Sequence, residues 1–160
     1  MNKFVPMLLV GTMLTVGAGA IATAASAPDP VIGTWTLNVQ KSKFMPGHAP
    51  KSETRTYEQT ADGMKLTVSG VAADGSAISE GATFKYDGKP YPFTGAADFD
   101  TISGRRINGS TVKSILKKDG KLVGTGIRSI SDHGKVLTLK SMGKDAKGHR
   151  IHVVMVFDKQ

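Results

Sequence analysis

Closely spaced turn dipeptides constrain the fold of this chain more than any other feature of its sequence. Asp-Gly or Asn-Gly occurs at 62–63, 74–75, 87–88, 108–109 and 119–120, and Asp132-His133-Gly134 adds a further turn. Such residues adopt the positive φ angles of tight hairpin turns. The segments between them alternate, and no stretch after residue 28 carries the 3.6-residue apolar period of a helix. The sequence therefore predicts an all-β, antiparallel meander.

The alternating segments predict about eight to ten strands. They lie at roughly 31–40, 53–60, 64–71, 77–86, 89–95, 101–107, 111–118, 121–131, 135–142 and 149–158. Pairing them across the turns gathers the apolar side chains on one face. A sheet that closes on itself covers such a face and removes its exposed edges. We therefore expect an up-and-down β-barrel, with a two-sheet sandwich as the alternative.

The first strand also carries a family resemblance. Residues 33–38 read Gly-Thr-Trp-Thr-Leu-Asn and 41–44 read Lys-Ser-Lys-Phe, followed by Thr-Arg-Thr-Tyr at 54–57 and Tyr-Asp-Gly-Lys-Pro-Tyr-Pro at 86–92. The Gly-x-Trp opening resembles that of the calycins, the lipocalins and fatty-acid-binding proteins. The whole set resembles a group of small secreted bacterial lipocalin-like proteins of uncharacterised function. This resemblance implies a calycin-like barrel in which Trp35 plugs the closed end.

The resemblance is incomplete in three places. Segment 45–52 is too short and too rich in proline for the helical lid of fatty-acid-binding proteins. The last predicted strand runs almost to residue 160, where typical lipocalins carry a helix, and the lipocalin Thr-Asp-Tyr motif is absent. A lipocalin's ligand is therefore not transferred to this chain.

Residues 1–27 have the pattern of a secretory signal peptide. Lys3 is followed by an apolar run from Phe4 to Ala22, and Ala25-Ser26-Ala27 matches a cleavage site. We expect cleavage near Ala27, export to the periplasm or the extracellular space, and a single domain at 28–160. Retention of the segment as a membrane anchor is the alternative.

Composition excludes several kinds of protein. The chain has no cysteine, which excludes disulfides, thiol nucleophiles and zinc–thiolate sites. Its net charge of +8 comes mainly from lysines predicted on the outer face. Because aromatic residues do not alternate with these lysines, we expect no nucleic-acid partner. Attraction to anionic polymers or lipid surfaces of the cell envelope is the alternative function.

Strand register places several polar residues on the predicted inner face. Arg55 and Tyr57 fall there, as does Arg105 or Arg106, depending on the turn at Asn108-Gly109. A buried arginine requires an anion or hydrogen-bond partners. These arginines either hold the anionic head of a ligand, pair with Glu53, Glu58 or Glu80, or emerge at the barrel rim. The full predicted ligand-binding set is Arg55, Tyr57, Phe84, Tyr86, Tyr91, Arg105, Arg106, Ser114, Thr125, Ile127 and Ser129.

Small polar residues dilute this face in the second half of the chain, which indicates either a cavity or a tapering barrel. We find no catalytic constellation, no metal-ligand spacing and no cofactor motif, so we expect neither an enzyme nor a metalloprotein. The sequence favours a monomeric binding protein for a small apolar or amphipathic, possibly anionic, ligand.

Overall fold

The computed structural model describes residues 28–145 and 147–160. The predicted signal peptide, residues 1–27, lies outside the described residues. The described chain consists of strands and one short 3-10 helix, η1 (Val39–Lys41). The strands are β1 (Gly33–Leu37), β2 (Lys43–Met45), β3 (Ser52–Thr60), β4 (Gly63–Val71), β5 (Ala77–Phe84), β6 (Asp87–Thr94), β7 (Thr101–Asn108), β8 (Thr111–Lys118), β9 (Lys121–Ser131), β10 (Val136–Lys144) and β11 (Arg150–Lys159).

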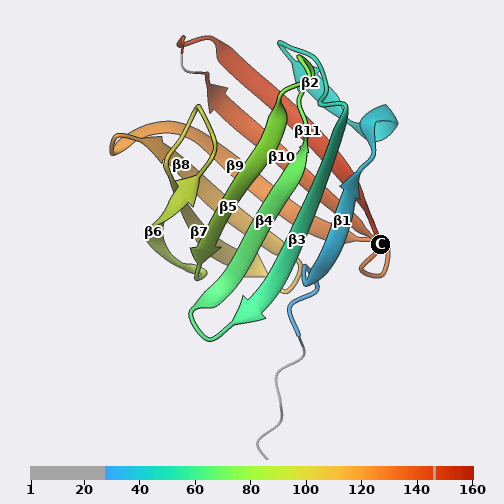
Figure 1. Cartoon of the computed structure of the whole chain (residues 1–160). Coiled ribbons are helices and arrows are strands. Elements are labelled where there is room, and N and C mark those ends of the chain that lie inside the picture. Colours follow the sequence, from blue (N-terminus) through green and yellow to red (C-terminus); the bar gives the residue numbers. More distant parts are fainter. Residues whose placement is uncertain (1–27, 146) are drawn as a thin grey trace, which may run out of the picture.

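The strands form one antiparallel sheet that closes on itself. From β3 to β11 each strand pairs with its neighbour in sequence, and β1 pairs with both β3 and β11. β1 and β2 pair with successive parts of β11, so the two short strands share one position of a ten-position barrel. Figure 1 shows β3, β4 and β5 crossing in front of β9 and β10. The predicted all-β, closed up-and-down barrel is confirmed, and the sandwich is not formed.

The core fills the end of the barrel that contains β1. Trp35, Leu137 and Phe157 are completely buried there, and the Trp35 indole Nε1 donates to the Val31 carbonyl over 2.7 Å. Val31 is also completely buried. The segment just before β1 therefore belongs to this packed end.

Asp29 fastens that segment to the barrel. Its Oδ1 accepts from the Val31 amide over 3.0 Å, and its Oδ2 accepts from Arg106 on β7. These contacts lower the pKa of the Asp29 carboxyl, although partial burial acts in the opposite direction. The residues preceding β1 are thus tied to the opposite wall.

The β3–β4 hairpin differs from prediction by an even number of residues. A turn at Asp62-Gly63 would pair Tyr57 with Val68, whereas the structure pairs Tyr57 with Leu66 and Arg55 with Val68. Side chains alternate with a period of two, so a slip of two residues keeps each on its face. Arg55 and Tyr57 therefore lie inside the barrel as predicted.

A β-bulge in β9 overturns the prediction for Thr125 and Ser129. The turn at Asp119-Gly120 pairs Lys118 with Lys121, but Val123 is an extra residue, and Leu116 then pairs with Gly124. An added residue reverses the faces of everything after it. Gly126 and Arg128 consequently face inward.

The following turn is also one residue longer than predicted. Val136 pairs with Ser131, so that Leu137 pairs with Ile130 and Leu139 with Arg128. The inward faces of β9 and β10 thus agree, and the side chains of Thr125, Ile127 and Ser129 turn away from the interior.

The β7–β8 turn decides between the two arginines. Asn108 pairs with Thr111, so the turn residues are Gly109 and Ser110. The register then shifts between Asn108 and Arg106, and Arg106 pairs with Val112. Val112 is buried on the inner face, so Arg106 shares that face. Arg105 is exposed on the other face, and its prediction as an inward residue was wrong.

The β5–β6 pairing is short. Only two pairs join these strands, Gly81 with Thr94 and Ala82 with Phe93. A two-residue turn at Asp87-Gly88 would also pair Phe84 with Tyr91, but this pair does not form, because β5 ends at Phe84 and an irregularity interrupts β6. The Tyr91 hydroxyl instead donates to Asp87 at the exposed turn, over 2.8 Å.

In the described part of the chain, no helix has the length and hydropathy needed to cross a membrane.

Candidate ligand-binding site

A cavity of about 280 Å³ lies inside the barrel, beyond the packed end. Its walls combine apolar side chains with two carboxyl and two guanidinium groups. The residues that border it are Glu53, Arg55, Tyr57, Leu66, Ile78, Glu80, Phe84, Phe93, Phe99, Ile102, Val112, Ser114, Leu116, Gly126, Ile127, Arg128, Leu139, Ser141 and Met155.

Small residues on one wall create this space. Pairing across β7 to β11 brings five positions into one row, Gly104, Ser114, Gly126, Ser141 and Val153. Four of the five carry a side chain no larger than that of serine. A Cβ added at Gly126 would meet Ser141 Oγ at 3.5 Å, an ordinary van der Waals contact. Side chains along this row therefore leave part of the barrel interior unfilled.

Glu53 and Arg55 project into the cavity from β3. Arg55 Nε donates to Glu53 Oε1 over 2.6 Å, and both side chains are nearly buried. Burial opposes the charge on Arg55, but the neighbouring carboxylate outweighs it and raises the pKa of the guanidinium. Arg55 thus has an internal partner, as the structural alternative for this residue predicted.

Arg128 is the second buried cation of the cavity, and its partners differ. It is 7 % exposed, and its Nη2 donates to the Tyr86 hydroxyl over 2.8 Å. Its guanidinium lies 5.2 Å from the centre of the Tyr57 ring and 5.3 Å from that of Tyr86. Arg128 forms no salt bridge with a described residue, and its buried Nε has no hydrogen-bond partner.

The electrostatic surroundings keep Arg128 charged. Burial acts against its positive charge, whereas Tyr57 and Tyr86 favour it, and the pKa of the guanidinium lies above its ordinary value. A buried charged group with an unpartnered donor is costly unless an anion or another hydrogen-bond acceptor joins it. Arg128 therefore carries a buried positive charge and one N–H donor that no described group accepts.

Glu80 projects into the cavity from β5, where it pairs with Val68 on β4. Burial raises the pKa of its carboxyl, and the nearby Arg55 only partly offsets this. Glu80 therefore holds its proton to a higher pH than an exposed glutamate.

The predicted site residues divide into three groups. Arg55, Tyr57, Phe84 and Ser114 border the cavity, and Ile127 borders it as part of the β9 wall between Gly126 and Arg128. Tyr86 and Arg106 lie at the packed end, with the Arg106 guanidinium 4.4 Å from the centre of the Tyr86 ring. The third group also lies outside the cavity lining and consists of Tyr91, Arg105, Thr125 and Ser129.

Sequence reasoning missed Arg128 because it assumed a regular β9. The segment Gly124-Thr125-Gly126-Ile127-Arg128 alternates glycine with larger side chains. Glycine within a strand marks a bulge or a place where space is left open. That alternation was the available indication that the glycine face, with Arg128, lines a cavity.

Among the described residues, no group of three or more His, Asp or Glu side chains could hold a metal ion.

Comparisons with known proteins concern the fold alone. No protein-family model matches the chain, and no curated protein matches it. A zebrafish ileal bile-acid-binding protein complexed with cholic acid matches with a TM-score of 0.47 and 12% identity, over 82% of this chain and 99% of that chain. The siderocalin Ex-FABP, described as having dual ligand specificities, matches with a TM-score of 0.38 and 10% identity, over 82% and 71%. These neighbours do not assign a ligand to this chain.

Proposed function

We propose that this chain binds a small amphipathic molecule with an anionic head inside the barrel and performs no chemistry on it. The anionic group lies against Arg128, and the apolar part lies along the aromatic and aliphatic walls. The row of small residues on β7 to β11 supplies the space for it.

The observation that carries this proposal is the unpartnered Nε of Arg128. The other buried cation, Arg55, is already paired with Glu53 at 2.6 Å. Arg128 donates to a tyrosine hydroxyl and packs against two aromatic rings, and it interacts with the Asp29 carboxylate without forming a salt bridge. A carboxylate, sulfonate or phosphate beside Nε would complete its hydrogen bonding and balance its charge.

The size of the cavity limits the ligand. At about 280 Å³ it lies at the lower end of ordinary ligand cavities, which span roughly 300–1,000 Å³. The proposed ligand is therefore smaller than a typical drug-sized molecule.

We further propose that the protein acts as a monomer after export, in the periplasm or outside the cell. The proposed export rests on the sequence of residues 1–27 alone.

A pair of matched dyes tests the proposal. 1-Anilinonaphthalene-8-sulfonate carries aromatic rings and a sulfonate, whereas N-phenyl-1-naphthylamine carries the same rings without the charge. We expect Arg128→Gln to weaken binding of the sulfonate about ten- to a hundredfold, because a charge-assisted contact is lost. Binding of the neutral dye should change little, which also shows that the barrel is folded.

Arg105→Gln is the matched control, since it removes an arginine from the outer face. It should leave both dyes unaffected. Equal loss of both dyes in Arg128→Gln, or no binding of either dye to the unaltered protein, contradicts the proposed anionic site. Native mass spectrometry of the purified protein would then identify any molecule that it retains.

A further inference from the structure

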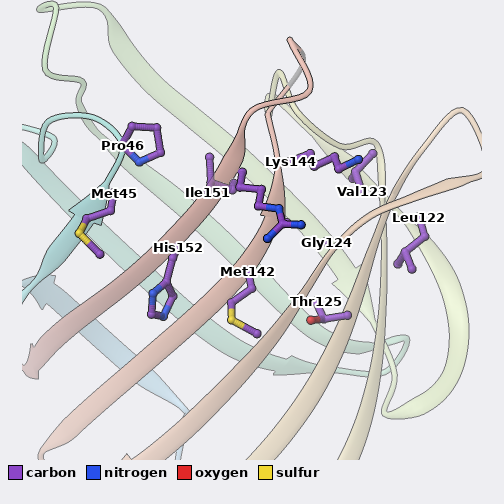
Figure 2. Close-up of a pocket in the computed structure, with 12 residues that line it drawn as sticks. Met45, Pro46, Leu122, Val123, Gly124, Thr125, Met142, Lys144, Ile151 and His152 are labelled. Atoms are coloured by element: carbon purple, nitrogen blue, oxygen red, sulfur yellow. The ribbon is translucent and has the colours of Figure 1, made fainter.

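The outer wall of the barrel carries an exposed apolar hollow that the proposed cavity ligand does not use. The hollow, of about 670 Å³, lies over the ends of β9, β10, β11 and β2 (Figure 2). Met45, Leu122 and Met142 line it, and they are 60%, 65% and 60% exposed. No other large apolar side chain in the described residues is as exposed as these three. Large exposed apolar patches mark interaction sites.

Strand register extends the hollow into an apolar row. Ile115 pairs with Thr125, Thr125 with Met142, Met142 with His152, and His152 with Met45. Paired residues lie side by side on one face of a sheet. Three exposed apolar side chains, on β8, β10 and β2, therefore lie in one line across five strands.

A row of lysines runs parallel to this apolar row. On the same three strands, Lys113, Lys140 and Lys43 precede Ile115, Met142 and Met45 by two residues, and so share their face. Register aligns these lysines with one another, through Ile127 on β9 and Val154 on β11. We call these six side chains, with Leu122, the basic apolar face.

The charge of this face has one sign. The ionisable residues lining the hollow are Lys144, Arg150 and His152, with no carboxylate among the described lining residues. The three aligned lysines are exposed, and none of them forms a salt bridge with a described residue. Asp145, at the nearby β10–β11 turn, is bonded to His149. The positive charge is therefore free to meet an external anion.

We propose that the basic apolar face docks on an anionic phospholipid bilayer. The lysines meet the lipid head groups, and the methionine and leucine side chains enter the interface between head groups and acyl chains. Apolar side chains flanked by cations bind in this way by combining buried area with electrostatic attraction. A protein partner fits less well, because the described residues that line the hollow include none of the tryptophan or tyrosine side chains that anchor protein interfaces. This inference does not depend on the cavity.

Vesicle co-sedimentation tests the inference. The probes are vesicles of phosphatidylcholine alone and of phosphatidylcholine with phosphatidylglycerol, at low and high salt. The N-terminus of the purified chain is established by mass spectrometry and is the same in every variant. We expect binding to the anionic vesicles only, and weaker binding as salt screens the attraction.

Three variants separate specific docking from a general charge effect. Replacing Lys43, Lys113 and Lys140 by Gln should weaken binding on the order of a hundredfold. Replacing Lys65, Lys85 and Lys89 by Gln removes the same charge from the β4–β6 side, and should weaken it by less than about threefold. Met45→Gln with Met142→Gln should weaken it roughly tenfold, because apolar contact is lost.

Each contrary result has a defined meaning. No binding of the unaltered protein to anionic vesicles, or equal loss in the two lysine variants, overturns the docking face. Loss with the lysines but not with the methionines also overturns it, and points to adsorption on anionic polymers.

A single fluorescent label gives a second readout. The chain has no cysteine, so Met142→Cys and Lys85→Cys each introduce one labelling site. With an environment-sensitive dye, anionic vesicles should shift the emission to the blue at position 142 and not at position 85. Equal shifts at both positions would overturn the proposed orientation.

Discussion

Glu53 and Arg55 lie two residues apart on β3 and form an ion pair inside the barrel, with Arg55 Nε 2.6 Å from Glu53 Oε1. Their side chains are only 7% and 12% exposed, so water does little to solvate either charge. Because alternate residues of a strand share a face, this pair is fixed by the strand itself. Arg55 therefore acts within the fold, which is why the proposed ligand site uses Arg128 instead.

The pair predicts an effect on stability. Arg55→Met leaves the Glu53 carboxylate buried without its cation and should lower the free energy of unfolding by roughly 3–5 kcal/mol. Adding Glu53→Gln should recover most of this loss. Denaturant unfolding, followed by the fluorescence of the single tryptophan, Trp35, measures both. Unchanged stability with lost sulfonate-dye binding would instead assign Arg55 to the ligand.

The contact between Arg128 and Tyr86 predicts a second effect on stability. Tyr86→Phe removes the acceptor of the only hydrogen bond described for the Arg128 side chain, and should cost about 1.5–3 kcal/mol. Tyr91→Phe is the control, because its hydroxyl bonds Asp87 at an exposed turn, and should change stability by less than about 0.5 kcal/mol. Similar values for the two variants would show that Tyr86 does not support the buried arginine.

Filling the cavity should abolish binding while leaving the fold intact. Gly126 borders the cavity, so the side chain introduced by Gly126→Leu would occupy it. The Cβ of the new residue makes only ordinary van der Waals contacts with Ser141 and its neighbours. We expect loss of both the sulfonate and the neutral dye, because neither can share the space. Circular dichroism and the unfolding midpoint should stay close to those of the unaltered protein. Retained binding would place the dye site elsewhere.

The position of Glu80 predicts how stability depends on pH. Its raised pKa means that the folded chain holds this proton to a higher pH than the unfolded chain does. The associated stability is complete below the ordinary value of 4.5, and is lost as the pH rises through the raised pKa. Glu80→Gln should therefore be more stable than the unaltered protein above this window. The difference should disappear below it, and a difference that grows on acidification would contradict the assignment.

The same carboxyl predicts the pH dependence of ligand binding. Protonation of Glu80 removes a negative charge from the cavity that also holds Arg128. Sulfonate-dye affinity should therefore rise as the pH falls through the raised pKa, and Glu80→Gln should flatten this part of the profile. The neutral dye serves as the control, and an identical profile for both dyes would exclude an electrostatic cause.

The sequence was sufficient to predict the architecture because turns and alternation are local properties. The β3–β4 register was two residues off, yet Arg55 and Tyr57 still lay inside, since an even slip preserves the face. The closed barrel followed from the number of strands and their single apolar face.

The site was less accessible to sequence reasoning because one residue can reverse a face. The bulge at Val123 turned Thr125 and Ser129 outward and brought Arg128 into the cavity. No property of Val123 itself marks it as the extra residue; its position follows from how the strands on either side pack. The choice between Arg105 and Arg106 also depended on one residue, at the β7–β8 turn.

The pairing of β1 with β11 makes closure of the barrel the most non-local step of folding. Each hairpin joins neighbours in sequence and closes only a short loop. The pairing of Trp35 with Lys159, in contrast, joins the two ends of the described chain. Contacts over such a separation carry a large loop-closure entropy and form late. Until β1 and β11 pair, the sheet remains open along both edges, and its interior, with the buried cations, stays in water.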